Sequence, residues 1–392
     1  MPANPAELYD LSPLLSVMLM GLVLAIGPLA WVWLRNRHGS ATRRLHALTV
    51  LTLFLTFDLI LFGAFTRLTD SGLGCPDWPG CYGNASPVGA HAEISAAQQA
   101  MPTGPVTHGK AWVEMIHRYL ATAVGVLSLV LAVASWMEAL SRRRTLGAAV
   151  VVSPWWATVT LLWVCIQGAF GALTVTMKLF PAIVTLHLLG GLLLLVLLSV
   201  QGVRYAQLHS PRASAPLPLG IRRFVWLGFI LLALQVALGG WVSTNYAVLA
   251  CTEFPMCQGS WWPEMNWPQG FELWRELGLT GEGRNIEFVA LTAIHYAHRL
   301  AAYLGVPVLA WLAWHLHGQA GWQRTAWTLA GLLLLQFLTG LSNVVLDWPL
   351  LAAVMHTGGA AALVLVLTRA LAVSGQSAGG AHTRSSVSGL DT

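Results

Sequence analysis

Nine stretches of about 20 residues are almost continuously apolar, and polar residues are concentrated between them. A bilayer-spanning helix needs about 20 apolar residues, because lipid offers the backbone no hydrogen-bond partners outside the helix. The pattern therefore predicts an all-α integral membrane protein with about nine spans. The predicted spans are 13–34, 46–66, 111–137, 150–176, 182–203, 223–244, 287–315, 325–346 and 350–371.

The composition supports this prediction and excludes other classes. Only 9% of the residues are charged, whereas soluble domains carry about 25%. The net charge of +5 does not indicate a nucleic-acid binder, because the basic residues form short clusters between apolar stretches. The first apolar stretch has no small-residue cleavage site, so we expect a retained helix rather than a signal peptide.

The basic residues also predict orientation. Fourteen Arg lie in one alternate set of connecting segments, and five Arg or Lys lie in the other. The positive-inside rule assigns the first set to the cytoplasm. We therefore expect a cytoplasmic (inner) membrane protein with an extracytoplasmic N-terminus, a cytoplasmic C-terminus, and extracytoplasmic loops at 67–110 and 245–286. The Gly/Ser-rich segment 372–392 is predicted to be a disordered cytoplasmic tail.

An internal repeat divides the chain. The loop motif Cys75–Cys81, of pattern C-x-[D/E]-[aromatic]-P-x-C, recurs as Cys251–Cys257 at an offset of 176. Two more blocks recur in the same order: Glu114–Tyr119 matches His295–Leu300, and Gln167 with His187 matches Gln336 with His356. The sequence thus predicts two tandem four-helix bundles, an N-terminal half at 46–204 and a C-terminal half at 223–371. Residues 1–45 would add one N-terminal transmembrane helix and a cytoplasmic loop.

A Gln-x-x-x-Gly pattern accompanies the repeat. It occurs at Gln167/Gly171, Gln235/Gly239 and Gln336/Gly340. Glycine on a membrane helix allows close approach of a neighbouring helix, and an amide side chain can hydrogen-bond across the contact. We therefore expect close helix packing at these three positions.

Four of the 13 histidines lie within predicted spans and also have a histidine counterpart in the other half. Ionisable residues are costly inside a membrane and usually functional there. Paired imidazoles from two helices suit a six-coordinate haem, whereas zinc would need further ligands that the sequence does not supply in both halves. These four candidate ligands are His117, His187, His298 and His356. A structural role for a buried His is the alternative.

Charged residues accompany these histidines. Arg118 and Arg299 each follow a candidate ligand, and each either packs between helices or pairs with a haem propionate or a nearby carboxylate. Glu114 lies one helical turn before His117 on the same side of the helix, and its counterpart is His295. This difference indicates that only one pocket carries out chemistry. A purely structural carboxylate is the alternative.

Two other features leave alternatives open. Asp58 in the second span has no acidic counterpart, and it could pair with an Arg or help to move protons. Both cysteine pairs can form disulfides in an oxidising compartment. Loop stapling is the favoured interpretation for Cys251/Cys257, whereas Cys75/Cys81 could be structural or redox-active. We expect the unpaired Cys165 to act as a small apolar residue within its span.

Together these motifs resemble one family. The segment from Arg67 to Gly83, followed by Glu114, His117 and Arg118, then by His298, Arg299 and His356, looks like bacterial haem A synthase of the type with two cysteine pairs. The resemblance covers about residues 46–371, and the additional first helix departs from it. It implies an oxidoreductase that converts a methyl group of haem O to the formyl group of haem A by successive hydroxylations. The product supplies haem-copper cytochrome oxidases.

The resemblance also implies roles for the two halves. His117, His187 and Glu114 would hold the substrate haem O in the N-terminal half, and His298 and His356 would hold haem b in the C-terminal half. Arg118 and Arg299 would bind the haem groups. Expected partners are membrane lipid, an unidentified electron acceptor, the farnesyltransferase that forms haem O, and further copies of the chain. Two competing interpretations are a di-haem b electron-transfer protein that does not modify haem, and a thiol oxidoreductase that uses Cys75/Cys81.

Overall fold

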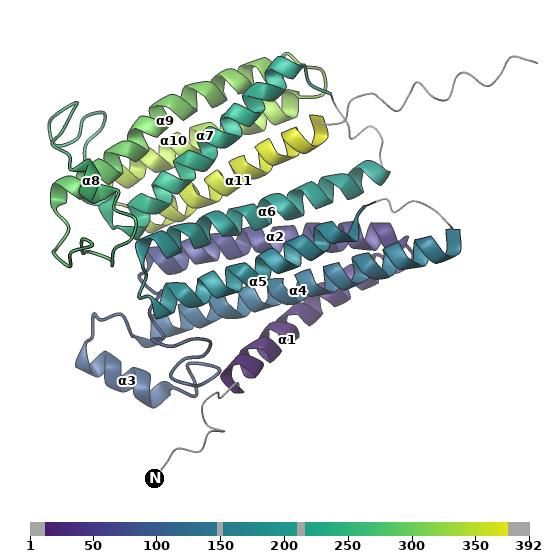
Figure 1. Cartoon of the computed structure of the whole chain (residues 1–392), viewed down its shortest axis with the longest axis horizontal. Coiled ribbons are helices and arrows are strands. Elements are labelled where there is room, and N and C mark those ends of the chain that lie inside the picture. The colour runs from purple at the N-terminus through teal and green to yellow at the C-terminus, as the bar shows by residue number, and fades with distance from the viewer. Residues whose placement is uncertain (1–11, 147–151, 210–215, 375–392) are drawn as a thin grey trace, which may run out of the picture.

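The computed structural model describes residues 12–146, 152–209 and 216–374. These residues form eleven α-helices and one 3₁₀ helix, with three isolated β-bridges in the loops (Figure 1). The helices are α1 (Ser12–Arg35), α2 (Ala41–Leu68), α3 (His91–Ala100), α4 (His108–Leu146), α5 (Pro154–Thr176), α6 (Pro181–His209), α7 (Leu219–Thr244), η3 (Ala247–Ala250), α8 (Trp267–Gly270), α9 (Phe288–His317), α10 (Gln323–Val345) and α11 (Leu350–Ser374).

Nine of the described helices are long and apolar enough to span a membrane, which confirms the predicted all-α membrane fold. Several predicted bounds need correction. Helix α4 runs to Leu146 rather than 137, because its polar end, which includes Arg142, continues the helix beyond the apolar stretch. Four other helices are also longer than predicted: α2 begins at Ala41, α6 ends at His209, α7 begins at Leu219 and α11 ends at Ser374. The short helices α3 and α8 lie inside segments predicted as loops. The predicted tail from 375 lies outside the described residues.

The spans form two bundles with the same arrangement of helices (Figure 1). In the N-terminal half, α2 and α5 each pack against both α4 and α6. In the C-terminal half, α7 and α10 each pack against both α9 and α11. Each half is therefore a closed ring of four helices, as the internal repeat predicts.

The halves meet along α2 and α6 on one side and α7 and α11 on the other. One apolar core crosses this contact, with Leu192 and Leu195 of α6 packed in the same cluster as Leu363 and Leu367 of α11. Because α6 and α11 are equivalent helices and touch each other, the two halves are related by an approximate two-fold axis between them.

A polar junction marks this axis at the loop end. Arg67 donates to the Tyr246 hydroxyl at 2.8 Å and to the Ser243 carbonyl oxygen at 2.7 Å, and its guanidinium lies 4.1 Å from the Tyr246 ring centroid. The Tyr246 hydroxyl donates to Asp70 at 2.6 Å. At the repeat offset of 176, Ser243 is the counterpart of Arg67 and Tyr246 is the counterpart of Asp70. Each residue thus contacts its own equivalent position across the axis.

We expect Arg67→Gln to lower the free energy of unfolding by about 1.5–3 kcal/mol, the range for hydrogen bonds to a charged group. The side chain is only 13% exposed, so solvent cannot replace the lost contacts. Equilibrium unfolding in mixed detergent micelles measures the change. The matched control is Arg284→Gln, which breaks the ion pair with Glu282. Both of these side chains are 75% exposed, so this substitution should change stability little. Equal effects of the two substitutions would contradict the importance of the junction.

Helix α1 belongs to neither ring and packs mainly on α4. Its backbone comes very close there, because a side-chain carbon added to Gly21 would lie 2.4 Å from Thr122 Cγ2. It covers a surface that the C-terminal half leaves open: Ala123 is 7% exposed, whereas its counterpart Leu304 on α9 is 58% exposed. Val17 of α1 also packs in the apolar cluster that contains Cys81.

Candidate functional site: two pairs of histidines

Each of the four predicted histidines packs against a glycine on the neighbouring helix. A side-chain carbon built on the glycine would lie 3.0 Å from His117 Cε1, 3.5 Å from His187 Cε1, 2.9 Å from His298 Cε1 and 3.1 Å from His356 Cε1. The four glycines are Gly63 on α2, Gly171 on α5, Gly239 on α7 and Gly340 on α10. The same contact therefore occurs four times, twice in each ring.

The hydrogen bond predicted for the glutamine side chain near each glycine is confirmed in the C-terminal half. The Gln235 amide nitrogen donates to the His298 carbonyl oxygen at 3.2 Å, and that of Gln336 donates to the His356 carbonyl oxygen at 3.0 Å. In the N-terminal half Gln167 lies against Gly190, one turn after His187. The fourth position, four residues before Gly63, is Leu59.

The C-terminal pair has the spacing that a single iron atom requires. The ring centroids of His298 and His356 lie 6.5 Å apart, and the ring planes are inclined at 76°. An iron atom bonded to one nitrogen of each ring at about 2 Å would separate the centroids by roughly 6 Å. The two residues come from α9 and α11, so they face each other across the ring of helices.

The N-terminal pair leaves polar atoms without partners. Nδ1 of His117 and Nδ1 of His187 are buried and accept or donate no hydrogen bond. The Phe62 ring lies nearly parallel to that of His117, with centroids 6.3 Å apart. Buried polar atoms without partners are uncommon in proteins and mark places where a ligand can complete the site. The residues present therefore fit a haem group in both halves.

A zinc-type site does not form in the described part of the chain. No three His, Cys, Asp or Glu side chains gather there in a way that could hold a metal ion. Asp58 forms no ion pair within the described residues. The structure therefore does not show the pairing with an Arg that was one of the two alternatives for this residue. The paired histidines therefore remain the candidate metal ligands, and the role of Asp58 stays open.

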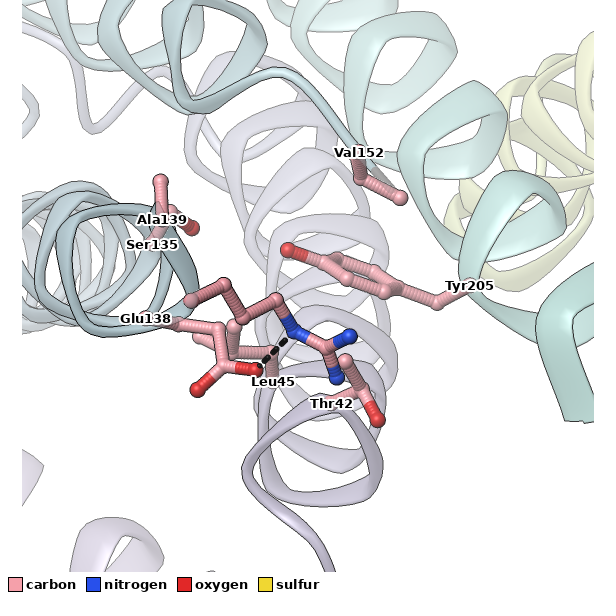
Figure 2. A pocket seen from close by; sticks show the side chains of 8 residues that line it. Thr42, Leu45, Ser135, Glu138, Ala139, Val152 and Tyr205 are labelled. Carbon is pink, nitrogen blue, oxygen red and sulfur yellow. Dashed lines mark hydrogen bonds and ion pairs between the residues drawn. The ribbon is translucent and has the colours of Figure 1, made fainter. Parts of the chain in front are cut away.

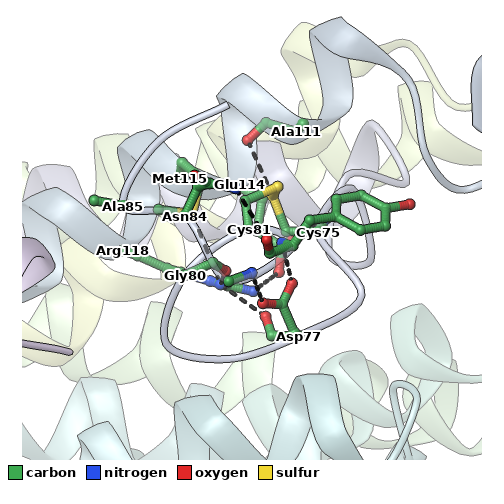
Figure 3. The surroundings of a disulfide bond; sticks show 12 residues. Cys75, Asp77, Gly80, Cys81, Asn84, Ala85, Ala111, Glu114, Met115 and Arg118 are labelled. Carbon is green, nitrogen blue, oxygen red and sulfur yellow. Dashed lines mark hydrogen bonds and ion pairs between the residues drawn. A yellow bond between two sulfur atoms is a disulfide. The ribbon is translucent and has the colours of Figure 1, made fainter. Parts of the chain in front are cut away.

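Glu114 connects the His117 helix to the loop of the first cysteine pair (Figure 3). Its carboxylate forms an ion pair with Arg118 at 2.6 Å and accepts a hydrogen bond from the Cys75 backbone N–H at 2.7 Å. Glu114 is only 3% exposed. Arg118 also donates to the carbonyl oxygens of Asp77, Pro79 and Gly80. A buried ion pair with this many hydrogen bonds holds the loop firmly on the helix.

The C-terminal half builds the same connection without a carboxylate. Arg299 donates to the carbonyl oxygens of Cys251 and Met256, each at 3.0 Å. His295, at the position of Glu114, has its Nδ1 2.9 Å from the Ala247 carbonyl oxygen. Both arginines thus hold the cysteine loops in place. Their predicted contact with haem propionates stays a prediction.

Both cysteine pairs form disulfides, with Cα–Cα distances of 4.9 Å. All four sulfur-bearing residues are completely buried. The acid of each motif caps its own loop: Asp77 accepts from the Gly83 N–H at 2.8 Å, and its counterpart Glu253 accepts from the Gly259 N–H at 3.0 Å. The predicted Cys251–Cys257 disulfide is confirmed, and a redox role for Cys75–Cys81 stays a prediction.

A small pocket at the opposite end of the N-terminal bundle is unrelated to these sites (Figure 2). It is lined by Thr42 of α2, Tyr205 of α6 and the Glu138–Arg142 ion pair of α4, whose charged atoms lie 2.6 Å apart. None of the candidate histidines lines it, so it is not a candidate haem site.

Fold and site together define a multi-pass membrane protein with two similar candidate sites, each built around a pair of histidines. The chain belongs to the family described as "Cytochrome oxidase assembly protein", whose model matches residues 46–368. A relative from Shewanella oneidensis, named "Heme A synthase", is 40% identical over 81% of this chain and 92% of its own. Relatives of the same name from Symbiobacterium thermophilum and Halalkalibacterium halodurans are 28% and 25% identical over 76% of this chain, covering 85% and 86% of their own.

Proposed function

We propose that this chain is a haem A synthase that oxidises a methyl group of haem O to the formyl group of haem A for cytochrome oxidase assembly. The observation that carries the proposal is the duplicated histidine pair, together with the family and the shared name of the relatives. The C-terminal spacing of 6.5 Å supports bis-histidine binding of haem b by His298 and His356. His117 and His187 hold the substrate haem O.

The difference between Glu114 and His295 supports this division of work. Only the N-terminal half has a buried carboxylate one turn from its first histidine. Haem held by His117 and His187 would supply the redox chemistry, and the electron acceptor would take up the electrons removed from the methyl group. Glu114 accepts a proton from the reacting methyl group or stabilises the positive charge that develops there. Arg118 and the Cys75 N–H hold the carboxylate in one position while it does so.

The positions of the charged residues and loops support the remaining assignments. The protein lies in the cytoplasmic membrane with its disulfide loops and N-terminus outside, where an oxidising compartment maintains both disulfides. The two halves correspond to residues 46–204 and 223–371. The partners are the farnesyltransferase that supplies haem O, an electron acceptor, and further copies of the chain.

Pigment extraction tests the function. We expect cells that express the protein with a source of haem O to yield haem A, and purified protein to retain haem b with a low-spin spectrum. Haem O and haem b without haem A would contradict the synthase and indicate an electron carrier.

The glycine contacts give a second test of the C-terminal site. We expect Gly239→Ala to reduce the haem b content, because its new methyl group would lie 2.9 Å from His298 Cε1 and the ring must move. Haem b per protein is measured by absorbance. Gly331→Ala on α10 is the matched control, since no atom lies within 4 Å of its added carbon. Full haem b occupancy in the Gly239 variant would show that this ring position is not needed.

A further inference from the structure

The two halves differ in the polar side chains that contact the histidine rings. In the C-terminal half, Thr339 Oγ1 lies 3.0 Å from His356 Nδ1. The same hydroxyl donates its proton to the Leu335 carbonyl oxygen at 2.7 Å, so toward the ring it acts as an acceptor for Nδ1–H. His356 therefore has Nε2 available to bind a metal.

The other C-terminal ring is also contacted by a polar side chain. The amide nitrogen of Gln235 lies 3.1 Å from Nδ1 and 3.2 Å from Nε2 of His298. A rotated amide would place its oxygen against the His298 carbonyl oxygen, so the nitrogen occupies this position and Gln235 acts on the ring by restraining its orientation. Because this amide nitrogen also donates to the His298 carbonyl oxygen, Gln235 restrains both the ring and its helix.

Neither ring of the N-terminal half has such a contact. His117 Nδ1 and His187 Nδ1 are buried without a partner. The repeat explains the difference at two positions: Leu59 stands where the second half has Gln235, and Phe170 stands where it has Thr339. The backbone geometry is nevertheless shared, since a side-chain carbon built on Gly63 or Gly239 would lie 3.0 or 2.9 Å from Cε1 of the facing histidine.

A hydrogen bond at Nδ1 strengthens a histidine ligand. It fixes the ring orientation and raises the electron-donating ability of Nε2, and losing such a partner typically costs about 10–100-fold in metal affinity. Two rings with partners therefore hold an iron atom more tightly than two rings without them.

We propose that Gln235 and Thr339 adapt the C-terminal half to retain its haem, and that Leu59 and Phe170 adapt the N-terminal half to release its haem after reaction. This inference rests on the proposed function, in which the C-terminal half keeps a cofactor while the N-terminal half takes up a substrate and gives up a product. The four side chains are positioning residues, because they act through the histidines.

The first arm of the test removes a partner. Thr339→Val keeps the shape but removes the acceptor, and Thr339→Ser keeps the hydroxyl as a matched control. The readout is the rate at which haem b passes from purified protein to excess apomyoglobin. We expect about 10–100-fold faster loss from the Val variant, corresponding to the affinity cost of a missing partner, and an unchanged rate from the Ser variant. We also expect a higher reduction potential in the Val variant, because a weaker donor stabilises ferric iron less.

The second arm adds a partner. Leu59→Gln introduces the amide of the second half, and Leu59→Met is a matched control of similar volume. Protein loaded with haem O is mixed with apomyoglobin, and the pigments are separated by chromatography so that haem O and haem b are followed independently. We expect haem O release to slow by about 10–100-fold in the Gln variant only.

An unchanged release rate in Thr339→Val overturns the proposal for the C-terminal half, and an unchanged rate in Leu59→Gln overturns it for the N-terminal half. If Leu59→Gln does not fold, Phe170→Thr introduces the other partner of the second half, and an unchanged haem O release rate in that variant overturns the proposal for the N-terminal half. Failure of the proposed function is distinguishable, because then His298→Ala would keep its haem b and His117→Ala would still bind haem O.

Discussion

Glu114→Gln should lower haem A formation by about 10²–10⁴-fold, the usual scale for loss of a general acid or base. Glutamine keeps the shape and one acceptor oxygen for the Cys75 N–H, but it cannot take a proton or carry the charge that Arg118 balances at 2.6 Å. Haem A per protein in extracted pigments measures the loss. Hydroxymethyl haem should accumulate if the later oxidation suffers more.

The chain supplies an internal control for this substitution. Glu138 and Arg142 form another Glu–Arg pair on the same helix, with the same four-residue spacing and the same 2.6 Å distance, at the far end of the bundle. Glu138→Gln should therefore leave haem A formation near its normal level. The haem b spectrum should be unchanged in both variants. Normal haem A yield from Glu114→Gln would show that Glu114 only holds the loop.

His298→Ala and His356→Ala should each remove the stably bound haem b. Each variant loses one of two iron ligands from a pair spaced 6.5 Å apart, and no third ligand lies nearby in the described residues. Haem b per purified protein and the low-spin absorption bands measure the effect. His315→Ala is the control on the same helix as His298, because this half-buried ring lies at the other end of α9 and stacks on Trp311. Unchanged haem b in both site variants would refute the assignment of the C-terminal pair.

The repeat allowed much of the fold and the candidate site to be predicted from the sequence. Matching blocks around Cys75, His117 and His187 recur in the same order, at offsets of 176, 181 and 169 residues, and this order determines which helices are equivalent. Apolar stretches of span length predict helices well, because lipid permits few alternatives. The close helix packing predicted at the three Gln-x-x-x-Gly glycines occurs in all three cases, each glycine lying against a histidine. The predicted hydrogen bond of the amide side chain forms in two of them, at Gln235 and Gln336.

Other features depend on contacts between distant segments and could not be predicted. Arg118 was open to a role at a haem propionate or a carboxylate, and the structure shows it holding Glu114 and the loop carbonyl oxygens, a choice set by how the loop folds back on α4. Thr339 could not be singled out from the sequence, because a threonine at a variable position of a Gln-x-x-x-Gly motif has no distinctive pattern around it. Comparing the two copies position by position, Thr339 against Phe170, is the signal that could have found it.

The placement of α1 determines which side of the N-terminal half is accessible from the hydrocarbon of the bilayer. Helices α2 and α6 pack against α11 and α7, and α1 covers α4, whereas the main contacts of α5 among the described residues are with α4 and α6. A substrate with a long isoprenoid tail diffuses laterally in the membrane, so it would meet this half along α5. The exposed free thiol of Cys165 lies on that helix and offers a position for a label that reports on such an approach.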